Sequence, residues 1–264
     1  MIDLKYALNA FQEYRNNYPN TERINLKVEH TKRVMKNSIQ LAKSLNLSEE
    51  DIALAGLIGL LHDIGRFEQA KIYDTFIDSQ SINHAMFSSE QLFKNGLIRK
   101  FVSDTQYDDI IKKAIENHNK FEIDKEVSGK ALFMSKLIRD ADKCDIYVQV
   151  LESDPVLVFD GNYDKTDKVS DKVLSDFMQH KCIETKDMNC KADDYVRKVA
   201  LIYGLYFPDS LKVIDEQNLI SRLTDHFINS FEFSNPNTVD TIRNVNKHAN
   251  KYISEQLREK DIER

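Results

Sequence analysis

The sequence has little of what builds turns, disulfides or membrane spans. Among 264 residues there are 7 Gly, 4 Pro, 3 Cys and no Trp, a composition poor in turn formers. No stretch reaches the roughly 18 apolar residues that a membrane span needs, and the N-terminus lacks the pattern of a signal peptide. The cysteines, odd in number and without a CxxC pair, fit reduced thiols in the cytosol. We therefore expect a cytoplasmic protein without a membrane partner.

The charge balance excludes an obvious polyanionic partner. The formal net charge is −6, so the chain has no basic surface for nucleic acid or anionic lipid, and no nucleic-acid partner is expected. A small anionic substrate is still compatible with this charge, because a bound metal ion sets its own local field. A chain of this length can also bury a sizeable core.

Apolar residues recur with helical periodicity along most of the chain and predict an all-α fold. The one candidate strand is short, at residues 156–159. We expect an N-terminal helix within 1–19, a helical core at 20–152 and a helical C-terminal region at 153–264 that packs on the core. The expected helices cover 2–16, 26–45, 52–61, 80–95, 105–118, 129–151, 170–181, 192–206, 209–227 and 238–260.

The segment 52–61 is apolar on every side, which predicts a buried helix. It ends in His62-Asp63-Ile64-Gly65, with Gly65 as the expected helix stop. A His-Asp dipeptide is expected by chance in a chain of this composition, so its location carries the argument. Two polar groups at the end of a buried helix cost free energy unless something pairs with them, and a divalent metal ion pairs with both.

Further metal-ligand side chains lie on other predicted helices. A single inward histidine is more often a core residue than a ligand, but together these positions supply imidazole and carboxylate donors for two divalent cations. Histidines in the C-terminal part have no comparable setting and are expected to be ordinary surface or structural residues. The ligand candidates are His30, His62, Asp63, His84, His118 and Asp142; the ordinary histidines are His180, His226 and His248.

The phrases VEHTKRV, LLHDIGR and IRDADKCD resemble the HD-domain superfamily of metal-dependent phosphohydrolases over about residues 26–150. This resemblance implies an HD-like helical bundle in which one ion is bound by His30, His62, Asp63 and Asp142. A subset of the superfamily adds two histidines that hold a second metal. The phrases INHAMFSS and IENHNK place His84 and His118 suitably, so the resemblance implies a second ion with Asp63 as the bridging carboxylate.

The implied activity is hydrolysis of a small phosphoester or phosphoanhydride, such as a nucleotide or dinucleotide, by a metal-activated water. Asp63 and Arg66 are the expected catalytic residues. Arg66 is also expected to bind the substrate, because its guanidinium suits phosphate, and Lys143, Arg33 and Lys120 are further substrate-binding candidates. One or two divalent ions are expected among Mn, Fe, Co, Ni, Zn or Mg, and histidine-rich ligation favours the transition ions.

Two other functions fit the same ligands: a di-iron HD-type oxygenase, and a non-catalytic sensor that binds a nucleotide. Local departures disfavour two particular substrates. Arg66-Phe67 follows the HD pair where relatives that hydrolyse guanosine penta- and tetraphosphate have two acids, and the Gly-Tyr-Pro of the cyclic-di-GMP branch is missing.

Overall fold

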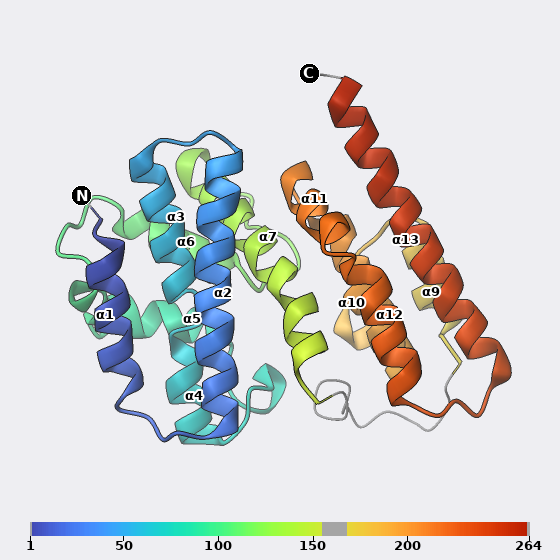
Figure 1. Ribbon diagram of the computed structural model, residues 1–264. Helices are drawn as coiled ribbons and strands as arrows, with labels where there is room; N and C mark the ends of the chain where they lie inside the picture. Colours follow the sequence, from blue (N-terminus) through green and yellow to red (C-terminus); the bar gives the residue numbers. More distant parts are fainter. Residues whose placement is uncertain (1, 155–167, 263–264) are drawn as a thin grey trace. The chain divides into compact units, whose positions relative to one another are not determined.

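The computed structural model describes residues 2–154 and 168–262 (Figure 1). Within these ranges no residue lies in a strand, and the expected all-α fold is confirmed. The candidate strand at 156–159 lies outside the described residues. The chain divides into two compact units, Met1–Asp142 and Lys143–Arg264, with the division inside helix α7 (Gly129–Glu152).

The first unit is built around the buried helix α3, which contacts α1, α2 and α6. Figure 1 shows α2 and α3 side by side. The elements of this unit before α7 are α1 (Leu4–Arg15), α2 (Glu22–Ser44), α3 (Glu49–Leu61), α4 (Gly65–Tyr73), η1 (Asp78–Gln80), α5 (His84–Ser89), the π-helical turn η2 (Glu90–Lys94), η3 (Leu97–Lys100) and α6 (Asp108–Asn117).

Local sequence explains how α3 begins and why α2 can approach it. Ser48 caps its N-terminus, because the side-chain oxygen accepts a hydrogen bond from the backbone N–H of Asp51. Further along, a Cβ on Gly59 would lie 2.9 Å from Met35 Cα on α2. Only a glycine allows this close approach, which lays the end of α3 against α2 and brings His62 beside His30.

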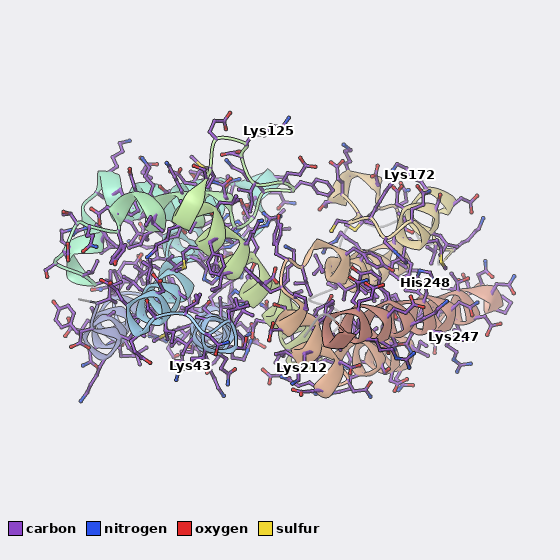
Figure 2. The ribbon with its side chains drawn as sticks, turned by 90° about the horizontal axis from the view of Figure 1, so that it is seen from above. Lys43, Lys125, Lys172, Lys212, Lys247 and His248 are labelled. Carbon is purple, nitrogen blue, oxygen red and sulfur yellow. The ribbon has the colours of Figure 1, made fainter. Side chains whose placement is uncertain are left out.

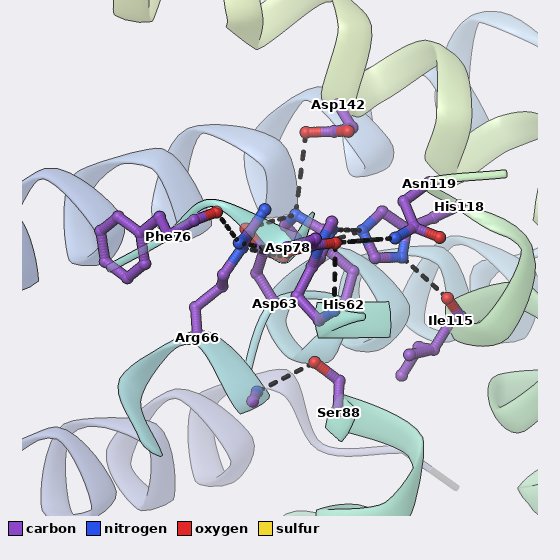
Figure 3. Close-up of polar contacts among 12 residues, drawn as sticks. His62, Asp63, Arg66, Phe76, Asp78, Ser88, Ile115, His118, Asn119 and Asp142 are labelled. Carbon is purple, nitrogen blue, oxygen red and sulfur yellow. Dashed lines mark hydrogen bonds and ion pairs between the residues drawn. The ribbon is translucent and has the colours of Figure 1, made fainter. Parts of the chain in front are cut away.

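Gly65 does not stop a helix as expected. Helix α3 ends at Leu61, His62 is its C-cap, and Gly65 begins the new helix α4. A Cβ at Gly65 would lie 2.6 Å from the backbone nitrogen of Ser88 on α5, while the Gly65 N–H donates to Ser88 Oγ at 2.9 Å (Figure 3). The glycine therefore serves the contact between α4 and α5.

The helix expected at 80–95 is shorter than the periodicity suggested. It begins at His84, because Asn83 caps α5 by accepting a hydrogen bond from the backbone N–H of Met86, and it continues as a π-helical turn. The cap fixes His84 as the first residue of the helix. The segment between α4 and α5 is irregular apart from η1.

The second unit has its own apolar core, in which the stacked rings of Tyr195 and Phe227 are both fully buried. No helix in the described ranges is long and apolar enough to span a bilayer. After α7, the elements are α9 (Asp171–Met178), η4 (Thr185–Asp187), α10 (Lys191–Val199), η5 (Ala200–Gly204), α11 (Pro208–Glu216), α12 (Leu219–Ser230) and α13 (Pro236–Ile262).

Candidate metal centre

The structure brings all six predicted metal ligands together inside the first unit. They come from five helices or their ends, and all except the partly exposed Asp142 are buried. Figure 3 labels four of them, His62, Asp63, His118 and Asp142, together with Arg66. The residues are His30 on α2, His62 and Asp63 after α3, His84 at the start of α5, His118 at the end of α6 and Asp142 on α7.

Asp63 lies between two sets of histidines. Its Oδ2 atom is 3.5 Å from His30 Nε2 and 3.7 Å from His62 Nε2. Its Oδ1 atom is 3.6 Å from His84 Nε2 and 3.7 Å from His118 Nε2. We call His30, His62 and Asp63 the first ligand group, and Asp63, His84 and His118 the second. In each group the donor atoms lie within 4.8 Å of one another, as a metal ion requires.

A second carboxylate approaches the first ligand group only. Asp142 Oδ1 lies 3.3 Å from His30 Nε2 and 3.8 Å from His62 Nε2. The two groups therefore differ at the Nε2 atoms of their histidines: Asp63 and Asp142 both approach these atoms in the first group, whereas Asp63 alone does so in the second.

In the second group, the Nε2 atoms of the two imidazoles face each other. His84 Nε2 and His118 Nε2 are 3.1 Å apart. The Nδ1 atom of His118 lies 2.7 Å from the carbonyl oxygen of Ile115, and that of His84 lies 2.5 Å from Asp78 Oδ2. Both acceptors require the hydrogen on Nδ1, so each neutral ring presents a lone pair at Nε2. A cation between the two nitrogens resolves this arrangement.

Asp63 shows the same need for a positive partner. Its Oδ1 atom is buried and has no hydrogen-bond partner among the described residues, which is costly for an ionised carboxylate. Burial would raise the pKa of Asp63, but the Lys27 ammonium and the surrounding histidines hold it well below its usual range. The carboxylate is therefore charged at neutral pH, and its Oδ1 atom, which lies 3.7 Å from Arg66 Nε, faces the Nε2 atoms of the second group at 3.6 and 3.7 Å. These residues fit a divalent ion.

The protonation states of the other donors also suit a metal. Burial lowers the pKa of His62 to about 4, against the opposing charges of Asp63 and Asp142. Burial likewise lowers the pKa of His84 to about 4, although its bond to Asp78 acts in the opposite direction. At Asp142, burial would raise the pKa, and the neighbouring His30 lowers it well below its ordinary value. At pH 7, His62 and His84 are therefore neutral imidazoles and Asp63 and Asp142 are ionised carboxylates, the forms that bind metals.

Residues 28–150 match the family model of the HD domain. The chain contains an HD domain. Members of this family are typically metal-dependent hydrolases, and the family in general comprises phosphohydrolases that act on small substrates. The expected membership of the HD superfamily is confirmed. No curated protein and no solved structure matches the chain.

Among the predicted substrate-binding residues, Arg66 lies at the candidate metal centre of the HD domain. Its Nε atom is 3.7 Å from Asp63 Oδ1, and its Nη1 atom donates to Gln69 Oε1 on α4, to the Phe76 carbonyl oxygen and to Asp78 Oδ1 in η1. Lys120 pairs with Asp124 one turn later at 2.5 Å. The roles of both residues stay predictions.

The other two candidates are placed differently. Arg33 is partly exposed on α2, one turn after His30. Lys143 begins the second unit, where its Nζ atom donates to the Gly204 carbonyl oxygen at 3.3 Å. Their role in substrate binding likewise stays a prediction.

Three residues outside the predicted set of site residues also shape the candidate centre. Lys27, one turn before His30, is buried with its Nζ atom 2.8 Å from Asp63 Oδ2; its helical spacing from His30 is the signal that could have found it. Arg139, one turn before Asp142, is buried and donates to the backbone carbonyls of the loop that follows α6, those of Asn117, His118, Lys120 and Phe121. Asp78, in the irregular segment before α5, gave no periodic signal.

Proposed function

We propose that the HD domain hydrolyses a small phosphoester or phosphoanhydride, such as a nucleotide or dinucleotide, in a metal-dependent reaction. The observation that carries this proposal is the position of Asp63, whose two oxygens face different histidine pairs. A carboxylate shared in this way suits two neighbouring divalent ions. In our assignment, the first ligand group and Asp142 hold one ion, and the second ligand group holds the other.

Two such ions, when bound, lower the pKa of a water molecule and offset the negative charge of phosphoryl oxygens. The residues of the chain supply the geometry for this chemistry. Asp63 holds the two groups at a fixed separation, while Lys27 offsets part of its charge. Arg139 ties down the backbone that carries His118. Because these contacts are buried, the donors need little rearrangement when ions bind.

The test is phosphate release by the full chain under anaerobic conditions. Metal-free protein is reloaded separately with Mn²⁺, Fe²⁺, Co²⁺, Ni²⁺, Zn²⁺ or Mg²⁺ and given p-nitrophenyl phosphate, nucleotides and dinucleoside polyphosphates. Asp63→Asn removes the charge of the shared carboxylate. Asp74→Asn is the matched control, because Asp74 is an exposed acid that pairs with Arg23.

We expect wild type and Asp74→Asn to release phosphate with at least one metal, and Asp63→Asn to release none. Turnover that consumes oxygen, with no anaerobic phosphate release, would contradict hydrolysis and indicate an oxygenase. Tight nucleotide binding at full metal loading without any turnover would indicate a sensor.

A further inference from the structure

Asp78 makes a direct connection to one of the proposed metal ligands. Its Oδ2 atom accepts a hydrogen bond from His84 Nδ1 at 2.5 Å and another from the His84 backbone N–H at 3.2 Å. One carboxylate oxygen thus holds both the imidazole ring and the first backbone amide of α5. The ring can rotate only if it breaks the side-chain bond.

The opposite oxygen of Asp78 is fixed by α4. Arg66 Nη1 donates to Asp78 Oδ1 at 2.9 Å, and Gln69 Nε2 donates to the same atom at 3.1 Å. The same Arg66 nitrogen lies 2.6 Å from the Phe76 carbonyl oxygen, and the fully buried Gln69 also donates to Ile82 O. Figure 3 shows Asp78 between Arg66 and Asn119. The carboxylate is therefore held on both sides before any metal binds.

The three histidines with a described Nδ1 contact are held in two different ways. His62 and His118 use backbone carbonyl oxygens, those of Gly59 at 2.8 Å and Ile115 at 2.7 Å. His84 uses the side chain of Asp78. A carboxylate on the far nitrogen of a histidine fixes the tautomer that leaves Nε2 unprotonated, and it raises the basicity of the ligand. Substitution of Asp78 can therefore release the His84 ring from its orientation without changing any proposed metal ligand.

We propose that Asp78 is a positioning residue for His84 in the second ligand group, and that Arg66 acts through Asp78 instead of through a substrate phosphate. This inference rests on the metal binding in the proposed function, but it does not depend on the substrate. It explains two contacts of Arg66 Nη1, those to Phe76 O and Asp78 Oδ1, which hold the carboxylate and its loop against α4, while the third contact joins Arg66 to Gln69 on the same helix.

The test measures metal affinity in the full chain. Metal-free wild type, Asp78→Asn, Asp78→Ala and Arg66→Gln are titrated with Mn²⁺ and Co²⁺ by calorimetry, and bound ions are counted by elemental analysis. Asp74→Asn and Arg23→Gln are matched controls, since this neighbouring Asp–Arg pair contacts no ligand histidine in the described contacts.

We expect two binding steps in wild type and in both controls. In each Asp78 variant one step weakens about 10- to 100-fold, the usual effect of removing such a partner, while the other step is unchanged. Asn can donate to His84 Nδ1 and force the proton onto Nε2, so Asp78→Asn is expected to be at least as damaging as Asp78→Ala. Arg66→Gln weakens the same step less.

A second measurement uses the wild type alone and does not depend on how well the variants fold. In ¹⁵N NMR spectra of the metal-free wild type, His84 is expected to carry its hydrogen on Nδ1; a hydrogen on Nε2 would overturn the inference. Wild-type affinities at both binding steps in well-folded Asp78 variants would also overturn the inference. If Arg66→Gln keeps the wild-type metal affinities but has a raised KM, Arg66 binds the substrate and the inference about Arg66 is wrong. Selective loss of one ion in a protein without hydrolytic activity would uphold Asp78 while the proposed function fails.

Discussion

Both units of the chain contain two histidines whose Nε2 atoms lie about as far apart as hydrogen-bonded atoms. In the first unit, His84 and His118 are 3.1 Å apart and buried. In the second unit, His180 and His248 are 3.0 Å apart, with His180 exposed and His248 partly exposed; Figure 2 labels His248 and its neighbour Lys247 on α13. The distance between the nitrogens does not distinguish the two pairs.

Their surroundings do. The first pair shares the unpaired oxygen of Asp63, and its two Nδ1 atoms are committed to fixed acceptors. The ring of His180 instead packs against Tyr203 and Tyr252, at centroid distances of 5.0 and 4.8 Å. Among the described residues, groups of three or more candidate ligands occur only around Asp63. An exposed neutral pair can share one hydrogen between its nitrogens, so it needs no ion. A shared carboxylate and fixed Nδ1 atoms distinguish the candidate metal centre from the pair in the second unit.

The largest change is expected from Asp63→Ala, which removes the carboxylate common to both ligand groups. The number of bound ions should fall from two per chain to none, and phosphate release should fall to background, because each group loses its only shared anion. Elemental analysis of the purified variant measures this directly. An unchanged metal:protein ratio would refute the assignment of Asp63.

Chelation of the wild-type protein should lower its stability through the first unit. An ion present at 100 times its dissociation constant stabilises a folded protein by about 2.7 kcal/mol, which corresponds to roughly 10 °C in Tm for a unit of this size. Scanning calorimetry with and without EDTA gives the shift. Asp63→Ala is the control and should show no shift, since it has no ions to lose; equal shifts in both proteins would contradict the account.

Variants that lack a single ligand should each affect only one of the two ions. His84→Ala should lose the ion of the second group and keep the other, whereas Asp142→Ala should weaken only the ion of the first group. Each should lower phosphate release by at least about 100-fold, the size of losing one electrostatic stabiliser at a reacting centre. Metal titrations of the two variants would show complementary losses; if both lose the same ion, the division is wrong.

The smallest effect is expected in the second unit. His248→Gln should leave the ion count and phosphate release unchanged and should alter the free energy of unfolding by less than about 0.5 kcal/mol, as for most surface substitutions. Metal analysis and denaturant unfolding check this. A lost ion would mean that the exposed pair is a metal site and that the comparison fails.

The sequence was informative where helical periodicity carries the information. The buried helix that ends at His62, and the inward face that carries His30, followed from the spacing of apolar residues. Helix α4 was missed because glycine after a helix usually ends it, whereas Gly65 here permits the close contact with Ser88. Asp78 lies in an irregular segment where no period constrains side-chain direction.

Contacts between residues far apart in the sequence could not be predicted, for a different reason. His180 and His248 are 68 positions apart, and nothing in their local patterns indicates that their rings meet. The contacts of Arg66 Nη1 with Phe76 and Asp78 likewise depend on how the segment before α5 folds back onto α4. Tertiary packing alone sets such contacts.

The most direct test of the central claim is a crystal structure of the Mn²⁺-loaded full chain with anomalous scattering. Two anomalous peaks are expected, one beside each carboxylate oxygen of Asp63. One peak should have His30 and His62 as neighbours, and the other His84 and His118. A single peak, or peaks at His180 and His248 with none at Asp63, would contradict it.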